Sequence, residues 1–501
     1  MDWGGWTILW LASEWLIRLV MLPVIVLRKA RPTTCLAWLA VIFFLPWPGL
    51  VVYLLIGENR LGRKRLEQRR SRFADLRIQQ RAVPVPAGGS AGVTLAEDDD
   101  GTDGYRPRDF SPETPLIPDD FQPMVSLVEK FTGWPVSSGN QVAFLCDAEL
   151  MVDRLAAEID AAKDHVHLLF FIFRDDYLGR RVGDALIRAA ERGVVCRVLV
   201  DAVGSRRMFR GLGAELRGHG VQLVPALPAR LYRLPFARLD LRNHRKLAVI
   251  DGRVAYTGSQ NIVEPSYGHR KAGRWHDITA RIVGPAVHHL QLLFSEDWFH
   301  ETGEWLDLPR YFPPPAACGD SVLQVLPSGP DMPGELFQDI FVKAVFLARE
   351  RIILTTPYFI PDEPLMMALR LAAYRGVRVD LVIPKRSDHP AVDAAGAFYY
   401  SRLVRDGVNV HYFLPGLLHA KTTTIDGRLA IFGSANYDIR SFLLNFELNL
   451  LLYSPPAVEE LVRLQERYLS LSQRLREDAL PDRVWPRRLW INLAKLLSPL
   501  L

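Results

Sequence analysis

Two long apolar runs open the chain, before any regular alternation of apolar and polar positions begins. They cover roughly residues 3–26 and 33–56, and each has about the 20 residues that a helix needs to cross a bilayer core. The pattern predicts a transmembrane helical hairpin over residues 1–58. Glu14 and Arg18 lie four positions apart, so they can neutralise each other on one helix face. Pro46 and Pro48 interrupt the second run, so a kinked or re-entrant segment is an alternative to a straight second span.

A basic stretch follows the second run and predicts the orientation. Between Arg60 and Arg81, nine Lys or Arg stand against two acidic residues, whereas the loop between the apolar runs carries only Arg28, Lys29 and Arg31. By the positive-inside rule, the rest of the chain lies in the cytoplasm with the N-terminus. We expect the basic stretch to contact anionic lipid head groups, with a solvated helix as the alternative. A cleaved signal peptide is disfavoured, because no basic residues precede the first run and no small-residue cleavage site follows it.

The remaining residues divide into a linker and two similar halves. Residues 82–120 are rich in Pro, Gly and Asp and lack apolar periodicity, so residues 59–123 are predicted to form the basic juxtamembrane segment and a flexible linker. From about Met124, strand-length apolar runs alternate with helical patterns, which predicts an α/β fold with mixed sheets. The same order then recurs, which predicts two halves, residues 124–315 and 316–480, packed around a shared central site. An amphipathic segment, residues 481–501, follows them.

Composition adds two points to this picture. Hydrophobic residues make up 49% of the chain and 12 of its residues are Trp, which is more than most soluble enzymes have and favours membrane contact. The four cysteines are far apart in the sequence and have no metal-ligand spacing. They are therefore predicted to be reduced thiols and not a disulfide framework.

Each half ends in one copy of the same frame. The copies read "HRKLAVIDGRVAYTGSQN" over residues 244–261 and "HAKTTTIDGRLAIFGSAN" over residues 419–436. In both, an Asp-Gly turn between two apolar runs predicts a hairpin. Residues i and i+2 of a strand share a face, so the histidine and lysine of each frame point the same way. The candidate catalytic residues are His244, Lys246, Asp251, His419, Lys421 and Asp426, of which the two aspartates lie at the turns and are expected to fix them.

The rest of each frame suits a phosphodiester. Gly-Ser-x-Asn brings backbone N–H groups and an amide to the same place, so we take Ser259, Asn261, Ser434 and Asn436 as phosphate-binding or supporting residues. One neutral imidazole can attack phosphorus while the other, protonated, gives a proton to the leaving alkoxide. The lysines and asparagines would stabilise the transition state. The set has no carboxylate cluster for a divalent metal, and we expect neither a metal nor a cofactor.

Each histidine also needs an acceptor that holds its second ring nitrogen, preferably a carboxylate. Asp277 in "WHDITARIVGPAV" and Glu447 in "NFELNLLLY" are the candidates for orienting the histidines. A single histidine–lysine frame near an Asp-Gly hairpin usually means nothing. Two full copies, each closing one half of an internal repeat, are hard to obtain by chance.

These residues resemble the phospholipase D superfamily, whose signature is HxK, four residues, Asp, six residues and Gly-Ser-x-Asn. The likeness is strongest to the bacterial cardiolipin synthases and includes "TPYFIPD" and "GSANYDIRSFLLNFELN". It implies that His244 is the nucleophile, His419 the acid and base, and Asp277 and Glu447 their acidic partners. The first frame departs from the family pattern in "GSQNIVEPSYG" and at His276, where Arg is usual, which leaves the acceptor alcohol open.

The resemblance also implies a reaction and a location. The enzyme would transfer a phosphatidyl group from one phosphatidylglycerol to another, giving cardiolipin and glycerol through a phosphohistidine. It would be a multi-pass protein of the bacterial inner membrane, with anionic membrane lipids as partners and its catalytic part in the cytoplasm. Two stretches, residues 229–242 and the C-terminal "VWPRRLWINLAKLLSPLL", could dock on the lipid surface. Burial between the halves is the alternative for both.

Four other functions compete with this one. A phospholipase D hydrolase, or a phosphatidyltransferase with a different alcohol acceptor, would use the same residues. A nuclease of the same chemistry is disfavoured because the sequence shows no basic groove interleaved with aromatic residues beyond the membrane-adjacent run, so no nucleic acid partner is expected. A silent lipid-binding scaffold is disfavoured by the two intact frames. No oligomeric state is predicted.

Overall fold

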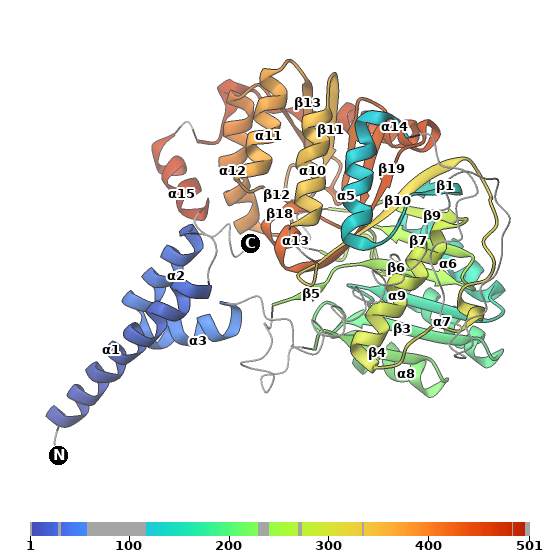
Figure 1. Cartoon of the computed structure of the whole chain (residues 1–501), viewed down its shortest axis with the longest axis horizontal. Helices are drawn as coiled ribbons and strands as arrows, with labels where there is room; N and C mark the ends of the chain where they lie inside the picture. The colour runs from blue at the N-terminus through green and yellow to red at the C-terminus, as the bar shows by residue number, and fades with distance from the viewer. Residues whose placement is uncertain are drawn as a thin grey trace, which may run out of the picture. The chain divides into compact units, whose positions relative to one another are not determined.

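The computed structural model describes residues 3–28, 32–57, 117–228, 240–268, 273–332, 335–482 and 484–495 (Figure 1). The chain divides into two compact units: residues 1–78 with 229–241, and residues 79–228 with 242–501. The predictions for the basic stretch, for residues 82–116 of the linker and for residues 229–239 lie outside the described residues.

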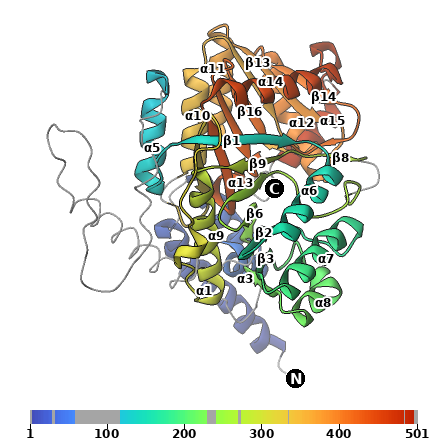
Figure 2. The same cartoon turned by 90° about the vertical axis from the view of Figure 1, so that its right-hand side faces the viewer.

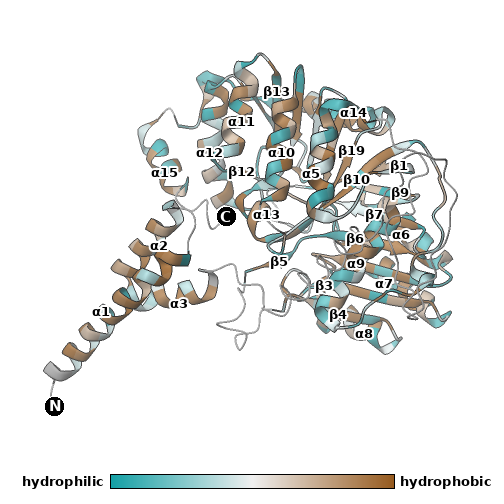
Figure 3. Ribbon diagram, viewed as in Figure 1, coloured by the Kyte–Doolittle hydropathy of each residue, from teal (hydrophilic) through white to brown (hydrophobic). Residues whose placement is uncertain are grey.

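The described part of the first unit contains three helices, α1 (Trp3–Arg28), α2 (Pro32–Phe44) and α3 (Pro46–Ile56). Within the described part of the chain, α1 is the one helix long and apolar enough to cross a membrane, and it is apolar along most of its length (Figure 3). Ile17, Met21 and Ile25 of α1 pack with Ile42 of α2 and Tyr53 of α3. The first predicted apolar run is thus confirmed as a helix, whereas the second is two shorter ones.

The break between α2 and α3 has a local cause. Pro46 has no backbone N–H and its ring clashes with the preceding turn, and Leu45 leaves the helical region with φ −133° and ψ 72°. The kinked form of the second run is therefore the one found, and a straight second span is wrong. Arg18 donates to the Phe43 carbonyl oxygen at 3.2 Å. This carbonyl lies in the last turn of α2, where the carbonyl groups have no partner within the helix. Arg18 also pairs with Glu14 at 3.1 Å, as the four-residue spacing predicted.

The second unit is built on a mixed sheet, to which the described residues contribute 16 strands. In the first half these are β1 (Ser137–Leu145), β2 (His165–Phe170), β3 (Val195–Asp201), β4 (Gln222–Ala226), β6 (Lys246–Ile250), β7 (Val254–Gly258) and β9 (Thr279–Val283). In the second half they are β10 (Ser321–Ser328), β11 (Arg351–Thr355), β13 (Arg378–Pro384), β14 (Asn409–Phe413), β16 (Thr422–Ile425), β17 (Leu429–Gly433) and β19 (Asn445–Leu452). The short strands β5 (Arg242–Asn243) and β20 (Ser472–Arg474) complete it.

The two halves repeat one strand order. It runs β4-β3-β2-β6-β7-β9-β1 in the first half and β14-β13-β11-β16-β17-β19-β10 in the second. Strands β2, β3 and β4 are parallel to one another, as are β11, β13 and β14, and the frame hairpins are antiparallel. The predicted pair of similar α/β halves is thus confirmed. The sequence did not predict that β1 and β10 pair with each other and join both halves into one sheet. Figure 2 shows β1 crossing between the two halves.

The helices of the second unit cover the sheet, except α15, which packs on α12. They are α5 (Gln122–Thr132), α6 (Ala148–Ala161), α7 (Tyr177–Glu191), α8 (Leu212–Gly218), α9 (Ala286–Thr302), α10 (Leu336–Leu347), α11 (Glu363–Tyr374), α12 (Pro390–Arg405), α13 (Ile439–Leu443), α14 (Pro455–Ser470) and α15 (Trp485–Lys495). One core lies under α6, α7 and α8 and another under α5, α10 and α11. A third is shared between the halves, because α9 and α14 both pack into it with strands from each half.

Helix α5 lies in the core of the second half, although the predicted first half begins at residue 124. Its apolar face, Met124, Val125 and Val128, packs in the same core as Phe337 and Phe341 of α10, and Figure 1 shows α5 beside α10. The strands of the first half begin only with β1. The predicted boundary at residue 124 therefore does not coincide with the division between the cores, and the other domain boundaries stay predictions.

Candidate active site

The two frames form the predicted hairpins, β6–β7 and β16–β17. At each turn the Asp and the following Gly have positive φ: 51° and 62° at Asp251 and Gly252, 52° and 63° at Asp426 and Gly427. Two central residues with positive φ are what a tight hairpin turn needs, and Asp and Gly are among the residues that adopt this conformation most readily.

The turn aspartates accept hydrogen bonds from the backbone. The Asp251 carboxylate accepts three backbone N–H groups at the start of β2, from Lys163, Asp164 and His165, each at 2.9 Å. The Asp426 carboxylate accepts the three equivalent N–H groups at the start of β11, from Arg349, Glu350 and Arg351. Each aspartate lies a whole strand, roughly 16 Å, from its frame's lysine. These contacts agree with the expected turn role, and the structure does not bring the two aspartates to the histidines as members of the catalytic set.

Both frames require glycine before the serine because a backbone carbonyl lies against it. A Cβ on Gly258 would lie 2.3 Å from the Ile278 carbonyl oxygen, and one on Gly433 would lie 2.3 Å from the Leu448 carbonyl oxygen. The serine N–H that follows donates to the same carbonyl in each half, at 2.9 Å. This close approach positions each frame against the residue that directly follows the carboxylate, Ile278 after Asp277 and Leu448 after Glu447.

Each motif histidine is held by a carboxylate from the other half. His244 Nδ1 lies 2.9 Å and 3.0 Å from the two carboxylate oxygens of Glu447, which is on β19. His419 Nδ1 lies 2.6 Å from Oδ1 of Asp277, which directly follows β8 (Trp275–His276). Since Nδ1 is engaged in both rings, Nε2 is the atom left for chemistry.

Burial and these partners decide the charge state of the site. Burial lowers the pKa of His244 and of His419 to about 4, against the opposing effect of their carboxylates. Burial alone would raise the pKa of Asp277, but His419 and neighbouring donors outweigh it and bring the value to about 2. The pKa of Glu447 is likewise lowered, because His244 and Lys246 outweigh burial. At neutral pH both imidazoles are therefore neutral and both carboxylates charged.

The two lysines sit in matching positions. The ammonium group of each donates to the main-chain carbonyl of its own frame's histidine, Lys246 to His244 and Lys421 to His419, both at 2.6 Å. Burial lowers the pKa of Lys246 to about 8 and that of Lys421 to about 7. A bound anion would favour their charged forms, so they suit the non-bridging oxygens of a phosphodiester.

The frame serines were predicted to bind phosphate or to support the site, and in the structure their hydroxyls bind the carboxylates that orient the histidines. Ser259 Oγ donates to Asp277 Oδ1 at 2.6 Å and accepts the Ile278 N–H at 3.0 Å. Ser434 Oγ donates to Glu447 Oε2 at 2.5 Å and accepts the Leu448 N–H at 2.9 Å. Each hydroxyl is thus used in holding the carboxylate that holds the histidine. The sequence missed two more donors to Glu447, the Ser441 hydroxyl at 3.0 Å and the Asn445 amide at 3.3 Å.

The frame asparagines differ from each other. Asn261 Oδ1 accepts the Ile172 N–H at 3.0 Å, and its amide nitrogen lies 3.4 Å from the Tyr267 hydroxyl. Asn436 donates its backbone N–H to Ser441 Oγ at 3.2 Å, while its side-chain oxygen is buried and has no hydrogen-bond partner among the described residues. Of the four predicted phosphate-binding residues, the two asparagines stay candidates for that role.

Aromatic rings lie against both histidines. The Phe171 ring lies edge-on to the His244 ring, with centroids 4.9 Å apart. The centroids of the Trp275 and His419 rings are 4.6 Å apart, and those of Tyr267 and Trp275 are 4.2 Å apart. The sequence interpretation missed these residues. Trp275 stands two positions before Asp277, and Phe171 directly follows β2, so their positions next to predicted elements were the available signal.

Arg245 is the one charged residue of the first frame that the second frame lacks, since Ala420 takes its place. The Arg245 guanidinium binds Asp297 of α9 at 2.7 Å, the Glu447 carbonyl oxygen at 3.1 Å and the Ser328 carbonyl oxygen at 3.3 Å. All these groups are buried. The first frame is therefore tied to strands β10 and β19 of the second half by a charged side chain, a contact that the second frame lacks.

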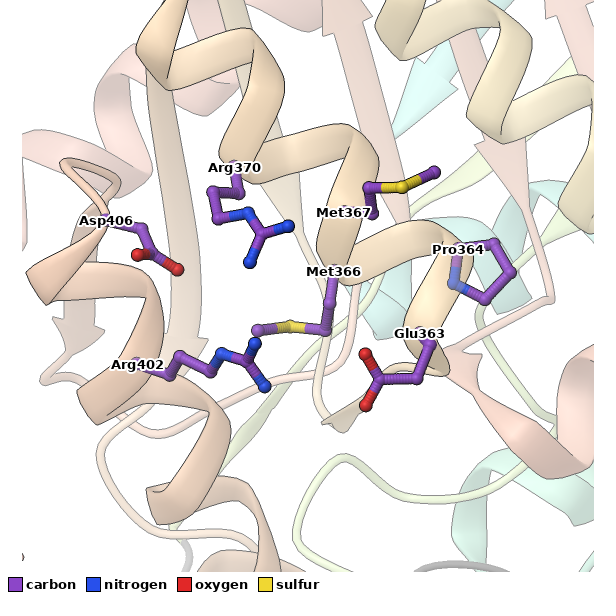
Figure 4. Close-up of a pocket in the computed structure, with 7 residues that line it drawn as sticks. All are labelled: Glu363, Pro364, Met366, Met367, Arg370, Arg402 and Asp406. Carbon is purple, nitrogen blue, oxygen red and sulfur yellow. The ribbon is translucent and has the colours of Figure 1, made fainter. Parts of the chain in front are cut away.

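A surface pocket lies elsewhere in the second half, between α11 and α12 (Figure 4). Its lining residues are Glu363, Pro364, Met366, Met367, Arg370, Arg402 and Asp406. None of the predicted site residues is among them. Among the described residues, no group of three or more His, Cys, Asp or Glu is arranged to hold a metal ion.

Comparisons with known proteins agree with this geometry. The family model described as cardiolipin synthase, PLD-like domain, matches residues 155–298 and 342–469. The chain is 34% identical over 488 residues to "Cardiolipin synthase A" of Proteus mirabilis, covering 95% of both chains. It is 33% identical to "Cardiolipin synthase A" of Serratia proteamaculans, covering 97% of this chain and 96% of the relative.

A solved structure shares the fold. The phosphatidylserine synthase of Haemophilus influenzae Rd KW20 superposes with a TM-score of 0.58 at 16% identity, over 75% of this chain and 99% of that one. The paired frames, their crossed carboxylates and the full-length relatives together identify the family. The chain belongs to the cardiolipin synthases of the phospholipase D-like type.

Proposed function

We propose that this protein is a cardiolipin synthase that transfers the phosphatidyl group of one phosphatidylglycerol to a hydroxyl of another and releases glycerol. The observation that carries the proposal is the crossed pairing of His244 with Glu447 and of His419 with Asp277. It supplies two oriented imidazoles beside two buried ammonium groups. The curated relatives named above are cardiolipin synthases of nearly the same length.

In the first step, Nε2 of His244 attacks the phosphorus of the donor lipid. Glu447 holds the opposite ring nitrogen and stabilises the positive charge that develops on the ring. The bond from phosphorus to the oxygen of the head-group glycerol breaks, and Nε2–H of His419 gives that oxygen its proton. The anionic donor raises the pKa of His419, so that this ring carries a proton when substrate is bound. The products are glycerol, neutral His419 and a phosphatidyl group on His244.

In the second step, the hydroxyl of the acceptor phosphatidylglycerol loses its proton to Nε2 of His419. Its oxygen attacks phosphorus, the phosphorus–nitrogen bond breaks, and His244 returns to its neutral form. Lys246 and Lys421 stabilise the charge on the non-bridging oxygens in both steps. The net change is two phosphatidylglycerols to one cardiolipin and one glycerol, with the protons balanced through His419.

A membrane position would favour a lipid acceptor over water, because it concentrates acceptor hydroxyls beside the site. Helix α1 supports such a position. We propose that the protein is embedded in the bacterial inner membrane by α1, with α2 and α3 as a re-entrant or second membrane segment, and that the catalytic unit is cytoplasmic. The excess of basic residues after residue 59 supports this orientation.

The test is product analysis. Purified protein in mixed micelles with phosphatidylglycerol alone should form cardiolipin and glycerol in equal amounts, and His419→Ala should form neither. Accumulation of phosphatidic acid without cardiolipin would make the protein a hydrolase. If cardiolipin forms only when a second phospholipid is supplied, or if added serine or ethanolamine is incorporated in preference, the acceptor in this proposal is wrong.

A further inference from the structure

Helix α15 presents large apolar side chains to solvent. Trp485, Leu489, Trp490 and Leu493 are 75%, 54%, 63% and 49% exposed, on a helix of 11 residues. At 100° per residue these four side chains fall within about 140° of the helix circumference. They therefore form one continuous face, which we call the outer face of α15.

The opposite side of the helix is already used. Ile491 and Ala494 are buried, and Ala494 packs with Val392 and Ala395 of α12. The Lys495 ammonium lies 4.1 Å from the centroid of the Phe398 ring, also on α12, and Figure 1 shows α15 beside α12. The helix thus packs on the protein through a different face, so the outer face is not the one that anchors α15 to the rest of the unit.

Helix α14 shows what a solvent-facing helix looks like in this protein. It is also amphipathic, with Val458, Leu461 and Tyr468 buried in the shared core. Its exposed positions carry charges of both signs, among them Glu459 and Arg463. Water solvates such a surface, whereas two tryptophans and two leucines on 11 residues indicate a less polar neighbour.

The charges on α15 favour an anionic lipid surface as that neighbour. Arg487 and Arg488 are exposed, and the helix has no Asp or Glu. Tryptophan has an apolar ring and a polar N–H, which suit the boundary between head groups and acyl chains. The four side chains of the outer face expose roughly 500 Å² of accessible surface, below the roughly 800 Å² per partner of a stable protein interface. A second copy docked on this face alone would be weakly held.

We propose that the outer face of α15 rests in the interfacial layer of an anionic phospholipid bilayer, with Arg487 and Arg488 at the level of the head groups. This deepens the proposed function, since it gives the catalytic unit its own contact with the lipid surface. That contact is separate from α1. It requires no catalytic turnover.

The experiment is photocrosslinking of the full chain in vesicles. A benzophenone amino acid is placed at Trp490, or at Leu493 as a second site, and at Leu150 of α6 as a matched exposed control (56% exposed). The vesicles are phosphatidylcholine with about one quarter phosphatidylglycerol, or phosphatidylcholine alone. After irradiation, lipid adducts are measured by mass spectrometry. Each protein is also prepared with His419→Ala, so that a failure of the proposed reaction cannot be mistaken for a failure of docking.

We expect lipid adducts at positions 490 and 493 at least about fivefold above those at 150, with or without His419. The yield should fall several-fold in phosphatidylcholine alone and when Arg487→Gln and Arg488→Gln are combined. Crosslinks to a second copy of the chain at position 490 would overturn the proposal in favour of self-association. Yields at 490 and 493 equal to that at 150 would overturn it outright, and yields insensitive to phosphatidylglycerol would overturn the anionic part.

Discussion

The two half-sites follow one plan and differ in its details. In both, a histidine is held by a carboxylate from the opposite half, and a serine of the Gly-Ser-x-Asn segment holds that carboxylate. Because the contacts cross, neither half contains a complete histidine–carboxylate pair. One half alone could not place its imidazole, so we expect the two halves to function only together.

The differences indicate a division of labour. His244 has a glutamate with three further donors, an edge-on phenylalanine and the neighbouring Arg245 anchor. Within the part of the chain that the structure describes, His419 has an aspartate with one serine donor, a tryptophan and Ala420 in place of the arginine. The more extensively fixed ring suits a group that becomes covalently bonded to phosphorus, whereas the other ring only exchanges a proton. This contrast supports His244 as the nucleophile.

The largest expected effect separates the two histidines. His244→Ala should reduce cardiolipin formation at least about a thousandfold and abolish a trapped phosphatidyl–enzyme adduct, because no atom remains to attack phosphorus. His419→Ala should be similarly inactive on phosphatidylglycerol. With a phosphatidyl p-nitrophenyl ester, however, the leaving group needs no proton. His419→Ala should then release a burst of about one equivalent of nitrophenolate per site, and His244→Ala none. A burst in His244→Ala and none in His419→Ala would reverse the two roles.

The carboxylates should show the same contrast at a smaller scale. Glu447→Gln and Asp277→Asn should each reduce turnover of phosphatidylglycerol by about a hundredfold or more, since each leaves its imidazole in the wrong tautomer or orientation. The p-nitrophenyl ester should restore the first step in Asp277→Asn and not in Glu447→Gln. Burst amplitude measured by stopped flow checks this. Equal rescue of both variants would refute the assignment of Glu447 to the nucleophile and of Asp277 to the acid and base.

The lysines predict the dependence on pH. Protonation of the nucleophile, His244, should lower kcat/KM as the pH falls through about 4. Deprotonation of Lys421 and then of Lys246 should lower it as the pH rises through about 7 and about 8. The first step also needs a proton on His419, whose pKa is about 4 in the free enzyme. Since kcat/KM reports the free enzyme, it should be highest near pH 4, fall by about tenfold per unit above it, and fall more steeply above about pH 7 as the lysines lose their charge. A profile whose slope does not steepen above pH 7 would show that the ammonium charges are not needed.

The serines should produce a smaller and unequal effect. Ser259→Ala removes the one serine donor described for Asp277 and should reduce kcat by about tenfold, the weight of a hydrogen bond to a charged group. Ser434→Ala should cost about threefold, because Glu447 keeps Ser441 and Asn445. Steady-state kinetics on both variants, with circular dichroism to confirm folding, tests this. Equal losses would mean that Ser441 and Asn445 do not keep Glu447 in position when the Ser434 hydroxyl is removed.

The sequence predicted what local pattern determines. Spacing gave both hairpins, their lysines on the histidine face and the turn role of the aspartates, and Asp277 and Glu447 were identified as the orienting acids. It could not give their crossed pairing, because His244 and Glu447 are 203 positions apart and His419 and Asp277 are 142 apart. The same limit hid the β1–β10 junction, the position of α5 and the partners of Arg245. For a related reason the sequence left open whether Ser259 and Ser434 bind phosphate or support the site: a serine near a phosphate site and a serine behind a carboxylate look alike until the fold places them.

The smallest expected effect on catalysis comes from the turn aspartates, although they belong to the signature. Asp251→Ala removes the acceptor of three backbone N–H groups. It also leaves an alanine at a positive φ of 51°, with no side-chain hydrogen bond to stabilise that conformation. We expect Tm to fall by about 2–5 °C and kcat, measured well below Tm, to stay within about threefold. Asp251→Gly is the matched control, because glycine accepts the positive φ and isolates the loss of the acceptor. Asp426→Ala and Asp426→Gly should behave alike in the second half. A hundredfold loss of kcat at unchanged Tm would place that carboxylate in the chemistry, and a loss confined to one half would show that the two turns, unlike the two histidines, are not equivalent.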